Sequence, residues 1–388
     1  MVARIFIVLL LLILLPDLYV DRMILRRKAS NRNLVRGLWW FQSVVFCIYT
    51  LMLTFSRDFA PSSITVLNVY LFIIGAIVVP KFVFAMCHFL GWAHCRYHHT
   101  TTNYGNHVGG VLAAGLCGLV IYGSTLGFSK VTVRHETFYS KDLPKEFDGY
   151  RIAHLSDAHV GTFNGSLIKI LEKEADMVNA LKPDLIVFTG DIQNMQPGEL
   201  AAATPALSSM KAKDGVYSIL GNHDYADYIK ADDSVKRANE RELVERERAM
   251  GWKLLLNENS VIRRGQDSIV IAGMENDGRP PFPQKGDLHK TMAGVDNNSF
   301  VLMLEHDPTA WRRKILPGSH AQLTLSGHTH AMQFEVMGWS PASFIYNEWG
   351  GMYNEGNRAL NVSVGMGGFI PFRIGASNEI VLITLKCG

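Results

Sequence analysis

The sequence predicts a helical membrane part followed by an α/β domain that carries metal-binding motifs. Three observations support this fold class. Residues 1–130 contain long apolar runs and almost no acidic residues. After them, short β-branched or Leu-rich runs alternate with helical patterns such as residues 166–180. Motifs rich in Asp, His and Asn follow several of these short runs, where an α/β sheet places its ligand crevice.

Four apolar runs within residues 1–130 are long enough, or nearly so, to cross about 30 Å of hydrocarbon. They cover residues 6–20, 37–55, 64–90 and 108–128. Few charges interrupt them, which disfavours the alternative of helices buried in a soluble protein. No small-residue cleavage site follows the first run, so we expect an anchor and not a removed signal peptide. The sequence therefore predicts a transmembrane helical domain of about four spans.

Basic residues predict the orientation of these spans. The first loop contains six of them: Arg22, Arg26, Arg27, Lys28, Arg32 and Arg36. The positive-inside rule assigns such a loop to the cytoplasm. With four crossings, the domain at residues 131–388 lies on the extracytoplasmic side of a plasma (inner) membrane. If one run lies flat in the interface instead, the parity changes and the domain faces the cytoplasm.

Pro80 and Lys81 interrupt the third run. We expect one kinked helix there, with the Lys81 side chain reaching toward the membrane interface.

Five short motifs and a closing strand occur in the second part of the chain. They are Asp157-Ala-His159, Gly190-Asp191, Gly221-Asn222-His223-Asp224, Glu305-His306, Gly327-His328-Thr329-His330 and Asn361-Val-Ser363. The five motifs follow predicted strands at residues 150–155, 185–189, 216–220, 301–304 and 323–326. Further strands are expected at residues 268–272, 359–363 and 379–385.

The residue types in these motifs favour transition-metal ions. Asp and His supply anionic oxygen and neutral imidazole, a mixed set that suits Mn, Fe or Zn, whereas an all-oxygen shell suits Mg or Ca. No cysteine lies near the motifs, so a thiolate zinc site is not expected. Two ions about 3.5 to 4 Å apart need a shared carboxylate and can hold both oxygens of a phosphoryl displacement. The isolated Asp191 is the natural bridge.

In this order, D-x-H, G-D, G-N-H-[DE], H and G-H-x-H, the motifs resemble those of the calcineurin-like metallophosphoesterase family. The resemblance covers residues 131–388 and implies two mixed β-sheets packed face to face and flanked by helices. It also implies a metal-dependent phosphoric ester hydrolase, a phosphodiesterase or phosphatase. Many membrane-associated members continue the last motif with Gly-Gly-Gln, whereas this chain has Ala331-Met332-Gln333, so a relative's substrate does not transfer directly.

The resemblance also implies the ligands of two divalent ions. The first ion would be surrounded by Asp157, His159, Asp191 and His330. The second would be surrounded by Asp191, Asn222, His306 and His328. A water or hydroxide held between the ions would be the nucleophile.

The same resemblance implies a catalytic pair beside the metals. His223 would protonate the leaving alkoxide or stabilise the transferring phosphoryl group, and Asp224 would hold its imidazole in the right tautomer. Asn222, His223 and Tyr225 are the expected substrate contacts. Tyr225 and Tyr228 follow the Asn222-His223 turn closely enough to line a pocket.

Several other features have less functional weight. His154 is expected to be a hydrogen-bonded core residue, and the charged segment 225–251 to form a solvated helix flanking the core. Aromatic residues within 334–353 fit either packing over the site or a lipid-facing rim. The formal net charge is +3, and no basic patch with interleaved aromatics indicates nucleic acid.

The sequence therefore predicts a membrane-anchored dinuclear phosphoesterase acting on a phosphoester or pyrophosphate bond. A phospholipid or lipid-linked phosphate is the substrate hypothesis, because the catalytic domain follows the last apolar run almost directly. The alternative is a non-catalytic metal-containing membrane protein acting in transport, sensing or partner binding. The size of the membrane part, which exceeds what an anchor requires, favours that alternative. The sequence gives no indication of oligomeric state.

Overall fold

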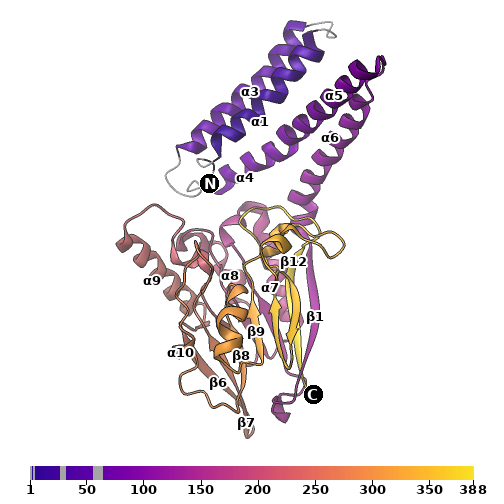
Figure 1. Ribbon diagram of the computed structural model, residues 1–388. Helices are drawn as coiled ribbons and strands as arrows, with labels where there is room; N and C mark the ends of the chain where they lie inside the picture. The colour runs from indigo at the N-terminus through magenta and orange to yellow at the C-terminus, as the bar shows by residue number, and fades with distance from the viewer. Residues whose placement is uncertain (1, 3–4, 27–31, 56–63) are drawn as a thin grey trace. The chain divides into compact units, whose positions relative to one another are not determined.

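A computed structural model describes residues 2, 5–26, 32–55 and 64–388 (Figure 1). The chain divides into two compact units, residues 1–125 and 126–388. The expected boundary at residue 130 lies within the second unit, because Phe128 is fully buried in the core of that unit. Asn378 Nδ2 also donates to the Phe128 carbonyl at 3.0 Å.

The described part of the first unit is helical. Its segments are α1 (Phe6–Val20) with the π-helix η2 (Asp21–Leu25), α3 (Arg32–Thr54), α4 (Ile64–Ile73) joined through η3 (Ile74–Val78) to α5 (Val79–His98), and α6 (Gly105–Tyr122) with η4 (Gly123–Gly127). Among the described residues, three helices, at residues 33–54, 64–98 and 105–127, are long and apolar enough to cross a membrane by length and composition. The α1 helix, with 15 residues, is shorter.

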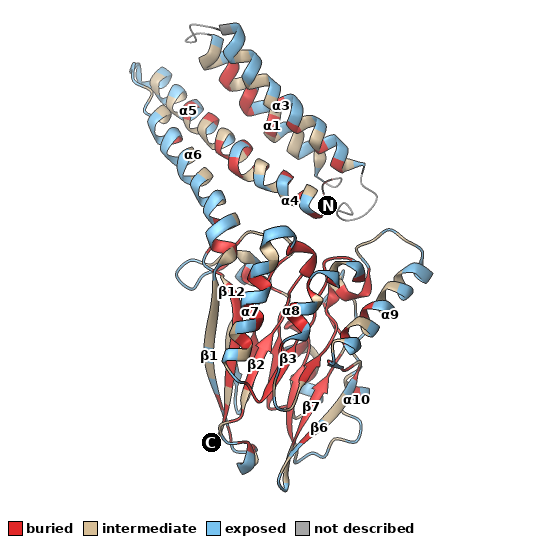
Figure 2. Cartoon of the chain, turned by 180° about the vertical axis from the view of Figure 1, so that it is seen from behind, coloured by how far each residue is buried: buried red, intermediate tan, exposed pale blue. Residues whose placement is uncertain are grey.

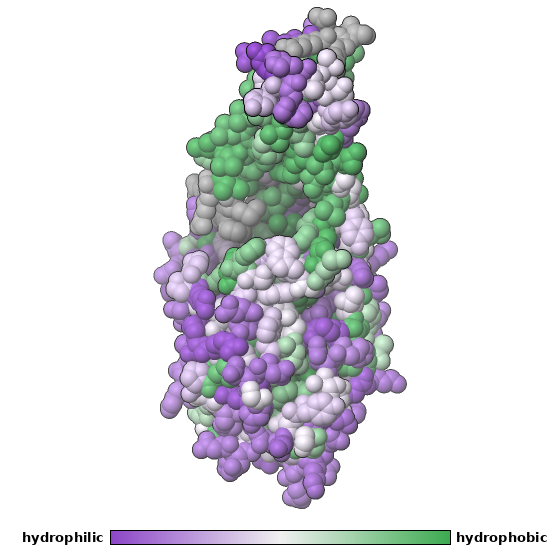
Figure 3. All heavy atoms as spheres, turned by 45° about the vertical axis from the view of Figure 1, so that its right-hand side comes forward, coloured by the Kyte–Doolittle hydropathy of each residue, from purple (hydrophilic) through white to green (hydrophobic). Residues whose placement is uncertain are grey.

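Many residues of the helices of the first unit are exposed (Figure 2), and many of these exposed residues are apolar. Leu38, Phe41 and Val111 are examples, each more than half exposed. In Figure 3 these helices present mostly hydrophobic residues, whereas the surface of the second unit is mostly hydrophilic. Exposed apolar surface of this extent is costly in water and favourable in a bilayer.

A buried ion pair joins two helices of the first unit. Lys81 Nζ of α5 lies 3.2 Å from Asp17 Oδ1 of α1, and the Asp17 side chain is almost fully buried. The Lys81 ammonium also lies 4.3 Å from the ring centroid of Trp39 in α3, and Ser43 of α3 donates to Asp17. The expectation that Lys81 reaches toward the interface is therefore wrong. The carboxylate of Asp17 holds the ammonium inside the helical unit, because an unpaired charge there is costly.

We expect Lys81→Met to destabilise the helical unit by about 3–5 kcal/mol, because it leaves Asp17 buried without its cation. Thermal unfolding of the full chain in detergent measures the effect. The double variant Asp17→Asn with Lys81→Met is the control, and it should recover much of the loss because no charge remains buried. The two single variants, Lys81→Met and Asp17→Asn, complete the comparison. If the loss of stability in the double variant equalled the sum of the losses in the single variants, a direct interaction between the two side chains would be contradicted.

The second unit contains two six-stranded mixed sheets. Sheet A has the order β1-β12-β2-β3-β4-β5, and sheet B has the order β10-β11-β9-β8-β7-β6. The strands of sheet A are β1 (Val131–Ser140), β12 (Asn378–Cys387), β2 (Arg151–Leu155), β3 (Leu185–Phe188), β4 (Val216–Ser218) and β5 (Lys253–Leu254). Those of sheet B are β10 (Gly351–Glu355), β11 (Arg358–Val362), β9 (Leu323–Ser326), β8 (Phe300–Leu304), β7 (Asp267–Gly273) and β6 (Glu258–Arg264).

Apolar side chains from both sheets form one core between them. Ile152 and Val187 of sheet A pack in the same buried cluster as Ile271, Leu302 and Leu325 of sheet B. A second cluster lies beneath the longer helices α7 (Ile168–Ala180) and α9 (Asp233–Ala249) and the short α8 (Thr204–Ser208). Two more short helices, α10 (Leu288–Thr291) and α11 (Leu316–Gly318), complete the unit. This architecture confirms the predicted sandwich of mixed sheets flanked by helices.

The short 3-10 and π segments of the second unit lie mostly in loops. They are η5 (Lys145–Phe147), η6 (Val160–Thr162), η7 (Gly165–Leu167), η8 (Pro197–Ala201), η9 (Asn222–Tyr225), η10 (Trp311–Ile315), η11 (His330–Gln333) and η12 (Pro341–Phe344).

The charged helix α9 flanks the core, as expected, and buries one side. Leu243 and Glu247 are buried, and Ser218 Oγ donates to the Glu247 carboxylate at 2.6 Å. Burial raises the pKa of Glu247 to about 7. The folded protein therefore binds this proton more tightly than the unfolded chain between about pH 4.5 and pH 7. Over that window the contribution of Glu247 to stability falls as the pH rises.

Glu247→Gln should remove this pH dependence. At pH 8 the variant is expected to be more stable than the wild type by up to about 3 kcal/mol, with no gain near pH 4. Melting temperatures of the full chain from pH 4 to pH 8 test the change. Glu245→Gln, at an exposed position of the same helix, is the control. Parallel pH profiles of wild type and Glu247→Gln would refute the assignment.

Candidate metal centre

The predicted ligands meet because parallel strands end at the same edge of the sandwich. Strands β2, β3 and β4 run parallel in sheet A, and β8 and β9 run parallel in sheet B. The predicted ligands that come two to four residues after the ends of these five strands are Asp157, Asp191, Asn222, His306 and His328. His159 and His330 follow two residues after their motif partners and complete the set.

The backbone at this edge is strained. Five predicted ligands are non-glycine residues with positive φ: Asp157 (52°), His159 (46°), Asp191 (58°), His328 (73°) and His330 (50°). Each such conformation costs of the order of 1–3 kcal/mol and persists only where the surroundings impose it. A concentration of strain in residues that carry candidate ligand atoms is typical of a functional site.

Gly190 shows how tightly the loops pack at this edge. Its φ is +92°, and a Cβ at this position would collide with the backbone of Gly221. Glycine therefore allows the loop after β3 to lie directly against the loop after β4. This approach brings Asp191 beside the Asn222-His223 turn, where His223 N donates to Asp191 Oδ1 at 2.8 Å.

One cluster joins Asp157, His159 and His330, whose ligand atoms all lie within 4.8 Å of one another. His330 Nε2 is 3.3 Å from Asp157 Oδ1 and 3.2 Å from His159 Nε2. His159 Nε2 is in turn 3.6 Å from Asp191 Oδ2. The backbone N–H of His328 donates to both oxygens of Asp157 and fixes that carboxylate.

A second cluster joins Asp191, His306 and His328. His306 Nε2 lies 3.2 Å from Asp191 Oδ2 and 3.2 Å from Asn222 Oδ1, and Asn222 Oδ1 lies 2.8 Å from His328 Nδ1. The Nδ1 of His306 faces the Thr189 carbonyl at 2.6 Å. A hydrogen bond from Nδ1 to a carbonyl turns the lone pair of Nε2 toward a metal position.

The carboxylate of Asp191 lies between the two clusters. It contacts His306 in one and His159 in the other, while its second oxygen accepts from the His223 backbone. The structure thus brings together all seven predicted ligands around the residue expected to bridge the ions. A third group joins His159 and Asp191 to His223, which was not predicted as a ligand.

Buried charge at the centre favours cation binding. Burial raises the pKa of Asp157 to about 6. Burial also opposes ionisation of Asp191, but the imidazoles of His306 and His223 outweigh it and hold the Asp191 pKa well below its usual range. Burial disfavours the imidazolium of His306, yet the two carboxylates raise its pKa well above the ordinary value.

These residues fit divalent metal ions. Among the described residues, the ion-pair partners of Asp157 and Asp191 are histidines and not Lys or Arg. Burial lowers the pKa of His159 to about 3, so this imidazole stays neutral and available as a ligand. Neutral imidazole and carboxylate oxygen form a donor set for Mn, Fe or Zn.

The expected contact between His223 and Asp224 is not present. Asp224 accepts from the backbone N–H groups of Asp191, Ile192, Gln193 and Gly221. Its carboxylate therefore holds the loop after β3 against the loop after β4. The Nδ1 of His223 faces the Asn194 carbonyl at 2.6 Å. That carbonyl, and not Asp224, sets the tautomer of His223, leaving Nε2 as the atom that can act on a ligand.

Tyr225 does not line the site as expected. Its side chain is buried, and its hydroxyl bonds to Glu275 Oε1 at 3.4 Å and accepts from Asn276 N at 3.3 Å. Tyr228 instead stacks on His223, with ring centroids 4.0 Å apart and planes 11° apart. Its hydroxyl accepts from Asn222 Nδ2 at 2.8 Å. Of the two tyrosines, Tyr228 is the one in contact with the site.

Sequence reasoning missed several other neighbours of the centre. Tyr346 places its hydroxyl 3.0 Å from His328 Nε2, and Phe282 packs edge-on against the same imidazole. Phe369 packs against His159 and His223. Of these three residues, only Tyr346 could have been found from the sequence, because it belongs to the aromatic segment after the last motif. Phe282 and Phe369 come from loops that carry no recognisable motif.

His154 is a core residue, as expected. It is fully buried in β2, and its ring contacts Thr189 Oγ1 at 3.0 Å and Asn361 Nδ2 at 2.8 Å. Asn361 in β11 accepts from Arg134 at 3.1 Å. Burial lowers the pKa of His154 to about 3, so the ring is neutral. The closing Asn361 motif therefore connects the two sheets behind the centre.

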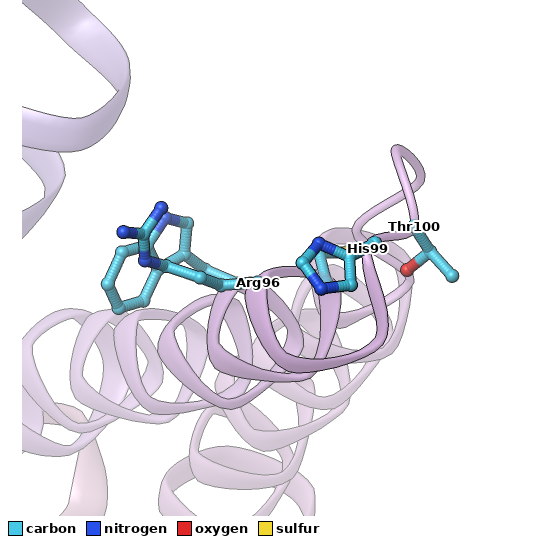
Figure 4. A pocket seen from close by; sticks show the side chains of 5 residues that line it. Arg96, His99 and Thr100 are labelled. Carbon is cyan, nitrogen blue, oxygen red and sulfur yellow. The ribbon is translucent and has the colours of Figure 1, made fainter.

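A separate pocket of about 480 Å³ lies in the first unit. It is lined by Trp92, Cys95, Arg96, His99 and Thr100, at the end of α5 and the turn that follows (Figure 4). A groove of about 350 Å³ in the second unit lies between the edge strands β1 and β10. None of the motif residues lines either feature.

Comparisons with known proteins agree with this site. The family model described as "Probable Calcineurin-like phosphoesterase, transmembrane domain" matches residues 3–128. The model described as "Calcineurin-like phosphoesterase" matches residues 150–332, which include all seven predicted ligands.

Three curated proteins illustrate the similarity. A transmembrane protein with metallophosphoesterase domain from Danio rerio is 31% identical over 253 residues, 63% of this chain and 55% of that protein. The uncharacterized metallophosphoesterase YkuE from Bacillus subtilis is 29% identical over 299 residues, 71% of this chain and 95% of YkuE. The UDP-2,3-diacylglucosamine pyrophosphatase LpxG from Chlamydia trachomatis is 26% identical over 298 residues, 62% of this chain and 86% of LpxG.

The match thus spans about half the length of the Danio rerio relative. Both family models carry the same phosphoesterase description, and the transmembrane model matches the unit with the long apolar helices. The chain therefore belongs to the calcineurin-like phosphoesterase family, as a member with a transmembrane domain.

Proposed function

We propose that this chain is a membrane-anchored, two-metal hydrolase of a phosphoester or pyrophosphate bond. The observation that carries the proposal is the arrangement of ligand atoms on both sides of the Asp191 carboxylate. A single metal site would not need a carboxylate shared between two imidazole clusters. Bound divalent ions would supply an activated water and neutralise charge on the phosphoryl oxygens.

The remaining residues position the substrate and move a proton. His223 is held by the Asn194 carbonyl and by stacking on Tyr228, so its Nε2 has a fixed direction. We assign it the protonation of the leaving oxygen or the stabilisation of the phosphoryl group. Asn222 takes part as a ligand through Oδ1, and Asp224 acts as a positioning residue through the backbone of the two loops.

A lipid-linked phosphate is the proposed substrate. The last candidate span ends at residue 127, and β1 begins at Val131. Three residues connect them, so the Cα atoms of residues 127 and 131 lie at most about 14 Å apart. This short connection keeps the hydrolase unit near the membrane surface. The name of the relative LpxG gives a sugar nucleotide with two acyl groups as its substrate. Both points support a phosphoester or pyrophosphate at the bilayer.

Metal-dependent hydrolysis tests this function. Purified full chain should release p-nitrophenol from bis(p-nitrophenyl) phosphate when Mn is added, lose the activity with a chelator, and regain it with excess Mn. Fe and Zn are the comparison metals. A chain that binds two ions per molecule yet hydrolyses no phosphoester or pyrophosphate would favour the non-catalytic alternative of transport, sensing or partner binding.

We further propose four crossings, with the hydrolase unit on the extracytoplasmic side of the plasma (inner) membrane. Together α1 and η2 contain 20 residues, about 30 Å of helix, which is enough for a span. A topology reporter fused after Gly388 tests this. Activity outside the cell supports the proposed side, and activity in the cytoplasm contradicts it, because a cytoplasmic first loop followed by the candidate spans 33–54, 64–98 and 105–127 places the unit outside.

A further inference from the structure

An apolar rim follows the last metal motif. It consists of Met332, Val336, Met337, Trp339, Phe344 and Ile345, which are between 42% and 101% exposed. The segment begins two residues after His330, and Trp339 and Phe344 pack against each other with ring centroids 5.9 Å apart. Single exposed apolar residues are common in soluble proteins, but six within 14 residues form a patch that indicates a binding surface.

The tip of the rim has a conformation that its sequence does not favour. Val336 and Trp339 exchange backbone hydrogen bonds of 2.9 and 3.0 Å, which closes a two-residue turn. Both turn residues have positive φ, 52° at Met337 and 77° at Gly338. Such turns prefer Asn, Asp or Gly at the first position. The Met337 side chain is fully exposed, so neither turn chemistry nor core packing accounts for a methionine there.

The rim is attached rigidly to the metal centre. Ser340 Oγ donates to the Ala331 carbonyl at 2.6 Å, and Gln333 Nε2 donates to the Ile370 and Phe372 carbonyls at 2.9 and 2.8 Å. Tyr346, directly after the rim, contacts His328 Nε2 at 3.0 Å. Whatever binds the rim is therefore held in a fixed position relative to the candidate ligands.

The chemistry of the rim fits the interface of a bilayer. Residues 331–350 include no Lys or Arg, and their only charges are Glu335 and Glu348. Arg312 Nε pairs with Glu348 at 2.6 Å, so little charge is left to attract a charged partner. Trp, Phe, Met and Ile side chains insert at the boundary between headgroups and acyl chains, and they do so without anionic lipid.

We propose that the apolar rim inserts into the lipid surface of the membrane that anchors this chain. The inference rests on the proposed function, because it identifies the substrate class of the same site as an amphiphile embedded in the bilayer. Glu335 N donates to the Ile374 carbonyl at 2.8 Å, and Asn378, four residues later, pairs with Val131 at the start of β1. The rim segment therefore lies at the end of the second unit where the three-residue connection from the last candidate span enters. Inserting beside His328 and His330, the rim brings the metal centre to headgroup phosphates.

Depth-dependent fluorescence quenching tests the insertion without any activity. The full chain, with its five native cysteines replaced by Ser, carries Met337→Cys labelled with an environment-sensitive dye, in phosphatidylcholine vesicles with brominated acyl chains. We expect quenching and a blue shift, both unchanged in high salt. Val261→Cys, at an apolar position on β6 that is 46% exposed, is the control and should remain unquenched. An unquenched dye at residue 337 would overturn the proposal, whether water or protein surrounds it.

Kinetics with two substrates of the same leaving group test the consequence. Bis(p-nitrophenyl) phosphate is soluble, whereas the p-nitrophenyl ester of phosphatidic acid is presented in phosphatidylcholine vesicles. Met337→Ser with Phe344→Ser should lower the ratio of kcat/KM for the lipid ester to that for the soluble ester at least about ten-fold. Val261→Ser should leave the ratio unchanged. Equal losses of kcat/KM on both substrates would overturn the proposal, because the rim would then only stabilise the structure of the site.

The two experiments also separate this inference from the proposed function. Quenching at residue 337 in a chain that hydrolyses neither ester would support the membrane contact and contradict the hydrolase. Hydrolysis of the soluble ester with an unquenched dye would support the hydrolase and contradict the membrane contact.

Discussion

Replacement of Asp191 by Asn is expected to lower hydrolysis of bis(p-nitrophenyl) phosphate by about 10³-fold or more and to reduce the bound metal. The amide can keep the hydrogen bond from His223 N, but it removes the negative charge shared by both clusters. Loss of several kcal/mol of charge stabilisation at two ions corresponds to at least three decades in rate. Rate assays with added Mn and metal analysis of the same sample measure both effects.

Asp184→Asn is the matched control. Asp184 is also buried, but it precedes β3 and pairs with Lys213 and Arg264, whereas Asp191 follows that strand. The control should lose stability and keep its metal content. A full complement of metal and near-native activity in Asp191→Asn would exclude a bridging role.

Replacement of His223 by Ala should lower the rate by about 10²- to 10⁴-fold, the range typical of a lost proton donor or electrostatic group. The loss should be larger for an alkyl ester than for the aryl ester, because an alkoxide needs a proton more than p-nitrophenolate does. Steady-state kinetics of both esters, with comparison of kcat and kcat/KM, measure the difference.

Metal analysis of His223→Ala distinguishes a proton donor from a ligand. The His223 ring groups with His159 and Asp191 at distances that also allow metal binding. If His223 acts on the substrate, the variant keeps two ions per chain. If the variant loses an ion together with its activity, His223 is a ligand and the proposed role is wrong.

The strands and the candidate ligands could be predicted because both depend on local pattern. Apolar runs such as 185–189 and 323–326 are buried on both faces and became β3 and β9. Residues that follow parallel strands converge because the carboxyl ends of these strands lie at the same edge of the sheet, so the strand pattern alone predicts that they meet. The edge strand β1 was not predicted, because its alternation of exposed and half-buried residues includes Arg134, His135 and Glu136.

The partners of individual side chains could not be predicted in the same way. Asp224 follows His223 directly, but the 3-10 turn η9 sends the two side chains in different directions, and Asn194 comes from another loop. The same turn buries Tyr225 and leaves Tyr228 against the imidazole. Spacing along the chain predicts which residues lie close together. Their hydrogen-bond partners depend on how loops from different parts of the chain pack.

The ion pair of Asp17 and Lys81 shows the same limit in the membrane part. The two residues are 64 positions apart, and no periodic pattern connects them. A single lysine in an apolar run suggests a side chain that reaches for water. The carboxylate on a neighbouring helix provides a closer partner, and its presence follows only from the packing of α1 against α5.

The two-metal centre is the central claim, and anomalous diffraction from a crystal of the full chain grown with Mn tests it most directly. We expect two peaks about 3.5 to 4 Å apart, with the Asp191 carboxylate between them and the imidazoles of His159, His306, His328 and His330 around them. A single peak, or peaks only at positions away from Asp191, would contradict the account.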